Sequence, residues 1–169
     1  MKANIPIVMD WVLKHEGGYA ERSTEGGGAV NMGVTFTTFA KWRKAQGKPV
    51  PTFADLKAMT RDEAIAIYEK YYLAPIGFDD LPSGLDYAVY DASVLGGVGG
   101  ALKLLAGTPE RSVDAFCDAR LARYRTFKTW NKVAVAKSGK TWGQIWTDRI
   151  EQVRKRAHDL ANEGYAHDG

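Results

Sequence analysis

The change at Glu16 from an apolar helical pattern to a glycine-rich stretch constrains this fold more than any other feature of the sequence. The apolar residues before it recur at steps of three and four, which predicts the buried face of a helix: Ile5, Val8, Met9, Val12 and Leu13. Glu16 continues that face, and Gly17 begins a natural helix stop. Six glycines fall between residues 17 and 33. This segment is therefore predicted to be a loop or a short irregular hairpin.

Glu16 is a candidate general acid because of its place on the apolar face of a helix end. Such a position disfavours the charged carboxylate and raises its pKa toward neutrality, as a proton donor requires. Helix geometry alone leaves a structural alternative, in which Glu16 bonds neighbouring backbone or pairs with an arginine. A second carboxylate, Glu25, follows in the glycine-rich stretch. Two carboxylates across a cleft suit glycosidic-bond cleavage, where one protonates the leaving oxygen and the other activates water or stabilises the oxocarbenium-like state.

The rest of the chain is predicted to be almost entirely helical. Thr60 and Glu63 have the spacing of a capping box at a helix start. Residues 85–95 are apolar on nearly every side, which is typical of a buried helix. Residues 111–165 are predicted to form two long amphipathic helices joined by a loop near residues 137–140. With 169 residues and 45% hydrophobic content, the chain suits one mostly α domain in two lobes.

Two side chains within these helices have more than one interpretation. Asp91 lies in the buried segment, where an unpaired carboxylate would cost several kcal/mol, so it is predicted to pair with Arg120 or Arg149. The rival interpretation makes Asp91 a second catalytic carboxylate or a hydrogen-bond acceptor for a sugar. Tyr72 shares an aromatic helix face with Tyr68. That face is either a stacking platform for sugar rings or part of the core.

Composition argues against several classes of protein. A single cysteine, Cys117, excludes an internal disulfide and is expected in the core. A net charge of +3 is modest, and no zinc spacing, RNA-binding signature or basic stripe indicates nucleic-acid binding. No run of about 18 apolar residues predicts membrane insertion. No metal or cofactor is implied, and the N-terminal residues are unlike a signal peptide, which predicts synthesis in a cytoplasm.

Three segments of the chain resemble glycoside hydrolase family 108, bacterial and phage N-acetylmuramidases of which some are described as secretion activators. The family's first motif reads here as Glu16-Gly17-Gly18-Tyr19, Glu25, Gly27-Gly28, Val30, Asn31, Gly33 and Val34-Thr35. Residues 81–91 resemble its second block. Residues 145–149 resemble its C-terminal Gly-Trp-x-x-Arg element, with Ile145 in place of the usual glycine.

The resemblance implies a lysozyme-like fold and makes Glu16 the acid that cleaves the bond between N-acetylmuramic acid and N-acetylglucosamine. Glu25 stands where the family usually has aspartate, and Val30 replaces a threonine and cannot hydrogen-bond. If that threonine positions water, Thr24, Asn31 or Thr35 must replace it. The predicted catalytic residues are Glu16, Glu25 and Thr35. The predicted substrate-binding residues are Gly17, Gly18, Tyr19, Gly27, Gly28, Asn31, Tyr72 and Asp91.

The expected organisation has two parts packed as one compact unit. Residues 1–110 are predicted to form the muramidase catalytic part. Residues 111–169 are predicted to form a C-terminal helical part that, by the resemblance, binds peptidoglycan. Within it, Trp130 is the candidate glycan contact, because Trp142 and Trp146 have the helical spacing of core residues.

The expected partner is the glycan strand of peptidoglycan, bound by a monomer. The predicted setting is lysis by a phage or prophage endolysin, made in the cytoplasm, released through a holin pore and acting on the wall in the periplasm. A secretion-associated muramidase would fit the resemblance equally. Two other functions stay open: a lytic transglycosylase that forms anhydro-muropeptides, and a non-catalytic wall-binding component of a secretion apparatus.

Overall fold

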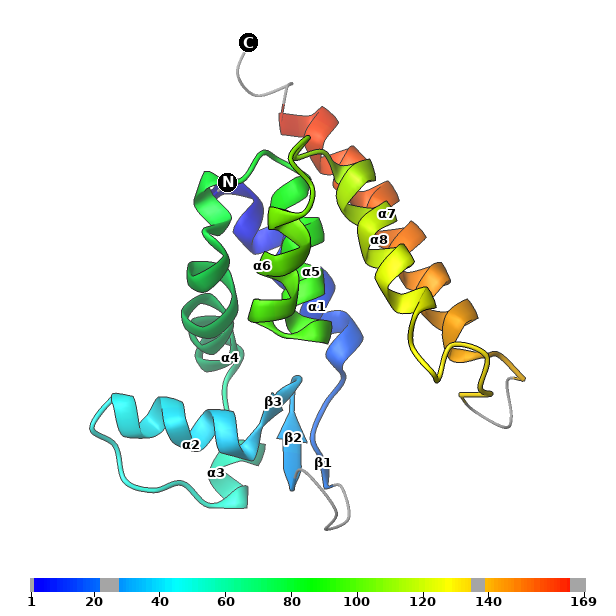
Figure 1. The fold of residues 1–169 in the computed structure, drawn as a ribbon. Helices are drawn as coiled ribbons and strands as arrows, with labels where there is room; N and C mark the ends of the chain where they lie inside the picture. Colours follow the sequence, from blue (N-terminus) through cyan, green and yellow to red (C-terminus); the bar gives the residue numbers. More distant parts are fainter. Residues whose placement is uncertain (1, 22–27, 135–138, 165–169) are drawn as a thin grey trace. The chain divides into compact units, whose positions relative to one another are not determined.

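The computed structural model describes residues 2–21, 28–134 and 139–164 and is mostly helical, which confirms the predicted mostly α, lysozyme-like fold class (Figure 1). The chain forms two compact units. Residues 5–74 make the first, here called the sheet unit, and residues 1–4 with 75–169 make the second, here called the helical unit. The units do not divide at residue 110, and the functional division into residues 1–110 and 111–169 stays a prediction.

The sheet unit begins with α1 (Ile5–Glu16), followed by three short strands and three helices. The strands are β1 (Ala20–Glu21), β2 (Ala29–Asn31) and β3 (Val34–Thr35), and the helices are α2 (Phe36–Ala45), α3 (Phe53–Lys57) and α4 (Arg61–Tyr68). A π-helical turn, η2 (Glu69–Leu73), extends α4. Of the predicted apolar face, Val8, Met9 and Val12 are buried, whereas Ile5 and Leu13 are half-buried.

The three strands form an antiparallel sheet in the order β1-β2-β3. Ala20 pairs with Val30, so the predicted hairpin after the first helix is confirmed, with residues 22–27 outside the described part of the chain. A tight connection through Met32 and Gly33 then brings β3 against β2, where Val30 pairs with Thr35. The third strand was not expected from the sequence, because two residues are too few to show an alternating pattern.

Side-chain caps begin the short helices of the sheet unit. Thr60 and Glu63 form the predicted capping box at α4, with the backbone N–H of Glu63 donating to Thr60 Oγ1 and that of Thr60 donating to Glu63 Oε2. Thr52 and Asp55 form a second one at α3. Each box satisfies backbone N–H groups that a helix start leaves unpaired. These local contacts explain how such short helices can form.

The helical unit contains the 3-10 turns η1 (Lys2–Asn4) and η4 (Phe78–Asp80) and four α-helices: α5 (Leu85–Gly96), α6 (Val98–Ala106), α7 (Val113–Arg125) and α8 (Trp142–Gly164). A further 3-10 turn, η3 (Ala74–Ile76), spans the boundary between the units. α5 contacts each of the other three helices, and α7 and α8 lie side by side with opposite chain directions (Figure 1). Two C-terminal helices were predicted and are present, but α7 ends at Arg125, so their connection begins well before the predicted loop near residues 137–140. None of the helices in the described ranges is long and apolar enough to cross a membrane.

The start of α5 is held by two contacts that sequence spacing did not suggest. Asp86 is fully buried, and its Oδ1 accepts from the backbone N–H groups of Gly84 and Tyr87. Gly84 has φ +86°, and a Cβ there would lie 2.2 Å from the carbonyl oxygen of Ala157 in α8. Only glycine allows α5 to begin this close to α8. This contact sets the position of the buried helix that carries Asp91.

Candidate functional site

Glu16 is the last residue of α1, as its pattern predicted. Gly17 follows with φ +73°, a conformation that glycine adopts without strain, and Gly17 and Gly18 are both exposed. A Cβ at either glycine would meet nothing within 4 Å, so packing requires neither glycine. The backbone therefore turns away from the helix at Glu16 into open space. The side chain of Glu16 lies outside the described part of the structure, and its role as acid stays a prediction.

Tyr19 and Asn31 both contact residues at the end of α3. Asn31 is 6% exposed, and its Nδ2 donates to the carbonyl oxygens of Leu56 at 2.9 Å and Lys57 at 3.2 Å. Both carbonyls belong to the last turn of α3, and that of Leu56 also accepts from the backbone N–H of Met59 at 3.2 Å. The Lys57 ammonium in turn lies 5.5 Å from the centroid of the Tyr19 ring. The Asn31 amide thus fastens β2 to α3, and substrate binding by Tyr19 and Asn31 stays a prediction.

Thr35 lies directly across the sheet from Val30. Residues paired in this way present their side chains on the same face of the sheet. Thr35 is also the N-cap of α2, where its Oγ1 accepts from the backbone N–H of Thr38 at 3.2 Å and lies 3.0 Å from Thr38 Oγ1. The Thr35 hydroxyl therefore lies next to Val30 on the sheet, where it also caps α2. Whether Thr35 takes part in catalysis stays a prediction.

Other candidate residues of the glycine-rich stretch between residues 17 and 33 are described only in part. Glu25, Gly27 and Thr24 lie outside the described residues, so their predicted roles have no structural test here. Gly28 precedes β2, and a Cβ added to it would lie 3.9 Å from the ring of Phe53. That separation is ordinary van der Waals contact, so packing alone does not demand glycine at this position.

The tyrosine face of α4 and η2 is partly core and partly surface. Tyr68 is 1% exposed, and its hydroxyl donates to the carbonyl oxygen of Met32 at 3.1 Å, which ties α4 to the turn between β2 and β3. Tyr72 is half-buried, with its ring centroid 5.3 Å from that of Tyr68. The core interpretation therefore holds for Tyr68. Tyr72 keeps an exposed portion, and its predicted sugar contact is not tested.

Asp91 pairs with both of its candidate arginines, where the sequence predicted one. Its Oδ2 accepts from Arg120 at 2.7 Å and its Oδ1 from Arg149 at 2.8 Å, and the carboxylate is 4% exposed. Arg120 is fully buried and also donates from Nε to the hydroxyl of Tyr124 at 3.3 Å. Burial alone would raise the pKa of Asp91, but the two guanidinium groups outweigh it and lower the pKa. This geometry favours the structural interpretation, because both oxygens are already engaged.

Trp130 belongs to an aromatic cluster formed by Tyr124, Phe127, Trp130, Trp142 and Trp146. Trp146 is its centre, with ring centroids 5.2 Å from Tyr124 and 6.2 Å from Trp130. Trp130 also covers Gly143, where a Cβ would lie 2.5 Å from the indole. The indole is therefore packed on α8. Trp142, 38% exposed, offers a large aromatic surface to solvent, although its spacing had predicted core packing.

The described residues include no group of three His, Cys, Asp or Glu side chains that could hold a metal ion. Cys117 is buried as predicted, and that burial raises the pKa of its thiol to about 11. A thiol with so high a pKa is protonated at neutral pH and is a poor nucleophile.

Comparison with known proteins adds the family and a related structure. The family model described as Glycosyl hydrolase 108 matches residues 9–97, which include Glu16, the three strands and Asp91. A solved structure of SagA from Brucella abortus is similar over 95% of this chain and 97% of its own, with 29% sequence identity and a TM-score of 0.74. Comparison with curated proteins gives no match.

Proposed function

Because the chain belongs to the glycosyl hydrolase 108 family, we propose that it is an N-acetylmuramidase that hydrolyses the β-1,4 bond between N-acetylmuramic acid and N-acetylglucosamine in peptidoglycan. The observation that carries this proposal is the family match, which runs from residue 9 within α1 through the sheet to the end of α5. The position of Glu16, the last helical residue before two exposed glycines, adds to it. A polymer needs an open groove around the reacting bond, and small residues leave room for one.

In this mechanism Glu16 donates a proton to the glycosidic oxygen as the bond to the sugar breaks. A general acid must be protonated at the working pH, which a carboxyl group on the apolar side of a helix achieves when its charged form is poorly solvated. Asp91 is unsuited to that role, because two arginines lower the pKa of its carboxyl. The proton donor is therefore assigned to Glu16.

A second group must stabilise the positive charge on the sugar or activate water. Glu25 is our candidate carboxylate. Thr35 is the candidate hydroxyl for holding the water, and its support is its position directly opposite Val30 in the sheet. A Val30→Thr, Thr35→Val exchange would test this pairing: the exchange retains activity if either side of the pair can supply the hydroxyl, whereas Thr35→Val alone lowers kcat.

The test of the function is mass spectrometry of purified peptidoglycan digested by the wild-type protein and by Glu16→Gln. The variant should keep its circular dichroism spectrum, because glutamine has nearly the same shape as glutamic acid. We expect reducing muramic acid ends in the wild-type digest and their loss in the variant. A folded wild-type protein that releases no products would overturn the proposal and favour a non-catalytic wall-binding protein.

One observation favours a second candidate, a lytic transglycosylase. Val30 cannot hold a water molecule by hydrogen bonding, and a transglycosylase needs no water because the hydroxyl of the sugar itself attacks. Its products end in an anhydro sugar. The same digest therefore distinguishes the two enzymes, since anhydro ends would replace reducing muramic acid ends.

We also propose the setting of a phage or prophage endolysin that acts as a monomer on the wall. In this scheme the protein is made in the cytoplasm and reaches the periplasm through a holin pore. The test is expression in a bacterium with and without a co-expressed pore-forming protein. Lysis only with the pore supports the scheme, and Glu16→Gln with the pore is the matched control for wall cleavage. Lysis without the pore would contradict it.

A further inference from the structure

A cavity of about 300 Å³ lies within the helical unit, lined by residues of α5, α6, α7, α8 and the turn after α7. Three aromatic side chains form much of its wall: Tyr124, Phe127 and Trp146. Two glycines, Gly96 and Gly100, also line it, where α5 ends and α6 begins. This volume is at the small end of the range for ligand pockets, and its lining is mostly apolar, as theirs is.

The aromatic wall is held in place by its neighbours. The ring centroids of Tyr124 and Phe127 are 5.3 Å apart, and that of Trp146 lies 5.2 Å and 5.7 Å from them. Tyr124 is 7% exposed and its hydroxyl accepts from Arg120. Phe127 is 39% exposed, so the wall is open to solvent on one side. Fixed aromatic faces of this kind favour a planar apolar body, which can stack or pack edge to face on them.

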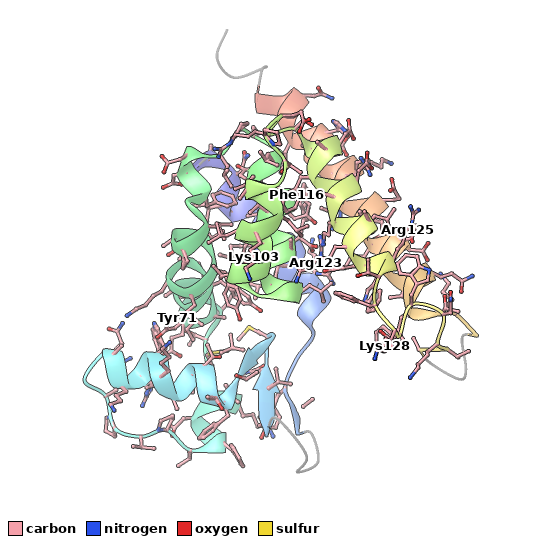
Figure 2. All side chains as sticks on the ribbon, viewed as in Figure 1. Tyr71, Lys103, Phe116, Arg123, Arg125 and Lys128 are labelled. Carbon is pink, nitrogen blue, oxygen red and sulfur yellow. The ribbon has the colours of Figure 1, made fainter. Side chains whose placement is uncertain are left out.

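Arg123 is the charged side chain that lines the cavity. It extends from α7 toward α6, on which Lys103 lies (Figure 2). Among the described residues the guanidinium of Arg123 makes no hydrogen bond or ion pair. By contrast, Arg120 on the same helix and Arg154 on α8 are paired with carboxylates. A guanidinium group is planar and can donate two parallel hydrogen bonds to the two oxygens of a carboxylate. The cavity thus combines an apolar wall with one available cation.

The absence of a side chain at residue 100 has no packing reason within the described structure. A Cβ at Gly99 or Gly100 would meet nothing within 4 Å, and neither residue has a positive φ. Glycine inside a helix costs about 0.5–1 kcal/mol relative to alanine. Gly100 lines the cavity and Gly99 does not. A larger residue at position 100 would occupy the space that a ligand needs.

From these observations we propose that the cavity binds a small carboxylate with a planar apolar body, its ring between the aromatic wall and Gly100 and its carboxylate on Arg123. This site is separate from the chemistry proposed for Glu16. Its test measures binding alone, so failure of the proposed muramidase activity would leave this result unchanged.

The experiment is a titration of the full chain with naphthoate and, as the uncharged match, naphthamide, followed by NMR at the indole N–H of Trp146. We expect naphthoate to shift this signal and naphthamide to bind roughly fivefold more weakly, which is the upper range for one exposed charge pair. Arg123→Gln should remove that difference. Gly100→Leu should weaken both probes by at least about tenfold, whereas the matched control Gly99→Leu should change binding less than about twofold, because only residue 100 lines the cavity.

Three outcomes would overturn the proposal. The first is no shift at Trp146 with naphthoate at millimolar concentration. The second is equal binding of naphthoate and naphthamide by the wild-type protein, which would show that the carboxylate does not contribute to binding. The third is an equal effect of the two leucine variants. Thermal unfolding of each variant checks its fold, and Gly100→Ala, which adds one methyl group in open space, provides a smaller change should Gly100→Leu fail to fold.

Discussion

Glu16 and Asp91 are carboxylates on helices of the two different units, and they differ in their place on the helix. Glu16 ends α1, and the next two residues are exposed glycines with no side chain to pack. Asp91 lies in the middle of α5, where two arginines from α7 and α8 take both of its oxygens. A carboxylate inside a helix bundle is therefore held in one charged state by its partners. At the end of α1, by contrast, a Cβ on either glycine would meet nothing within 4 Å.

The largest expected effect is on the rate of peptidoglycan cleavage when Glu16 is substituted. Glu16→Gln should lower the rate of peptidoglycan cleavage by about 10²–10⁴-fold, the usual contribution of a general acid, with little change in the free energy of unfolding. Release of soluble muropeptides measures the rate. Asp10→Asn on the same helix, whose pair with Arg61 lies on the surface, is the control and should keep activity. An equal loss in both variants would contradict the assignment of Glu16.

The opposite pattern is expected at Asp91. Asp91→Ala should lower the free energy of unfolding by about 3–5 kcal/mol, because it leaves the fully buried Arg120 charged and unpaired. Urea unfolding followed by circular dichroism measures this. The double variant Asp91→Leu, Arg120→Met removes both buried charges and should recover most of the loss. A single variant that loses less than about 1 kcal/mol would show that the ion pairs are not what holds α5.

A similar comparison can be made between two glycines of the helical unit. Gly84→Ala should cost about 3 kcal/mol, because its Cβ would lie 2.2 Å from the carbonyl oxygen of Ala157 and its φ is +86°. Gly99→Ala, where a Cβ meets open space, should be neutral or stabilise the protein by about 0.5–1 kcal/mol. Thermal unfolding of the two variants tests both values. Equal midpoints would refute the close contact between α5 and α8.

In the sheet unit, the hydrogen bonds of Asn31 should contribute a smaller free energy of unfolding than the contacts above. Asn31→Ala removes the side-chain hydrogen bonds to the carbonyl groups of Leu56 and Lys57 at the end of α3. It should cost about 1–2 kcal/mol, since each carbonyl loses a buried or half-buried donor. Chemical denaturation measures the loss. Asn31→Asp, which keeps the size of the side chain but has no donor, is the control and should be destabilised at least as much. Unchanged stability in both would argue that Asn31 serves the substrate alone.

The smallest expected effect is a dependence of stability on acid pH through Asp91. Its pKa in the folded protein lies below the ordinary value of 3.8, because the attraction of Arg120 and Arg149 outweighs the cost of burial. The stabilisation is therefore fully present above that ordinary value and is lost as the pH falls through the folded pKa. Urea midpoints measured from about pH 7 to about pH 2 should fall less steeply for Asp91→Ala than for the wild type. Parallel curves would contradict this account.

Local patterns predicted much of the helical structure. The end of α1 at Glu16, the capping box at Thr60, the buried helix α5 and the pair α7 and α8 were all expected. These features depend on residues within a few positions of one another, so their spacing is sufficient. The short strand β3 and the use of Thr35 as a helix cap were missed, because two paired residues have no pattern of their own.

The candidate site was predicted less completely. The motif around Glu16 identified the family, and the match to residues 9–97 confirms it. Spacing could not show that the amide of Asn31 binds the end of α3, or that Thr35 lies opposite Val30. The cavity beside Arg123 was missed altogether, because its lining comes from four helices and the turn after α7, and each residue taken alone has an ordinary helical environment.

The amino-acid sequence by itself determined where α1 ends, where α4 begins and which helix is buried, although it placed the end of α7 too late. Only the tertiary structure decided the partners of the buried groups. Asp91 meets Arg120 across 29 residues and Arg149 across 58, and the sequence offered both arginines without choosing between them. Helix ends follow from local hydrogen bonds and backbone conformation. A buried charge is instead stabilised by whichever cations the packing of distant helices brings within reach, which here is both.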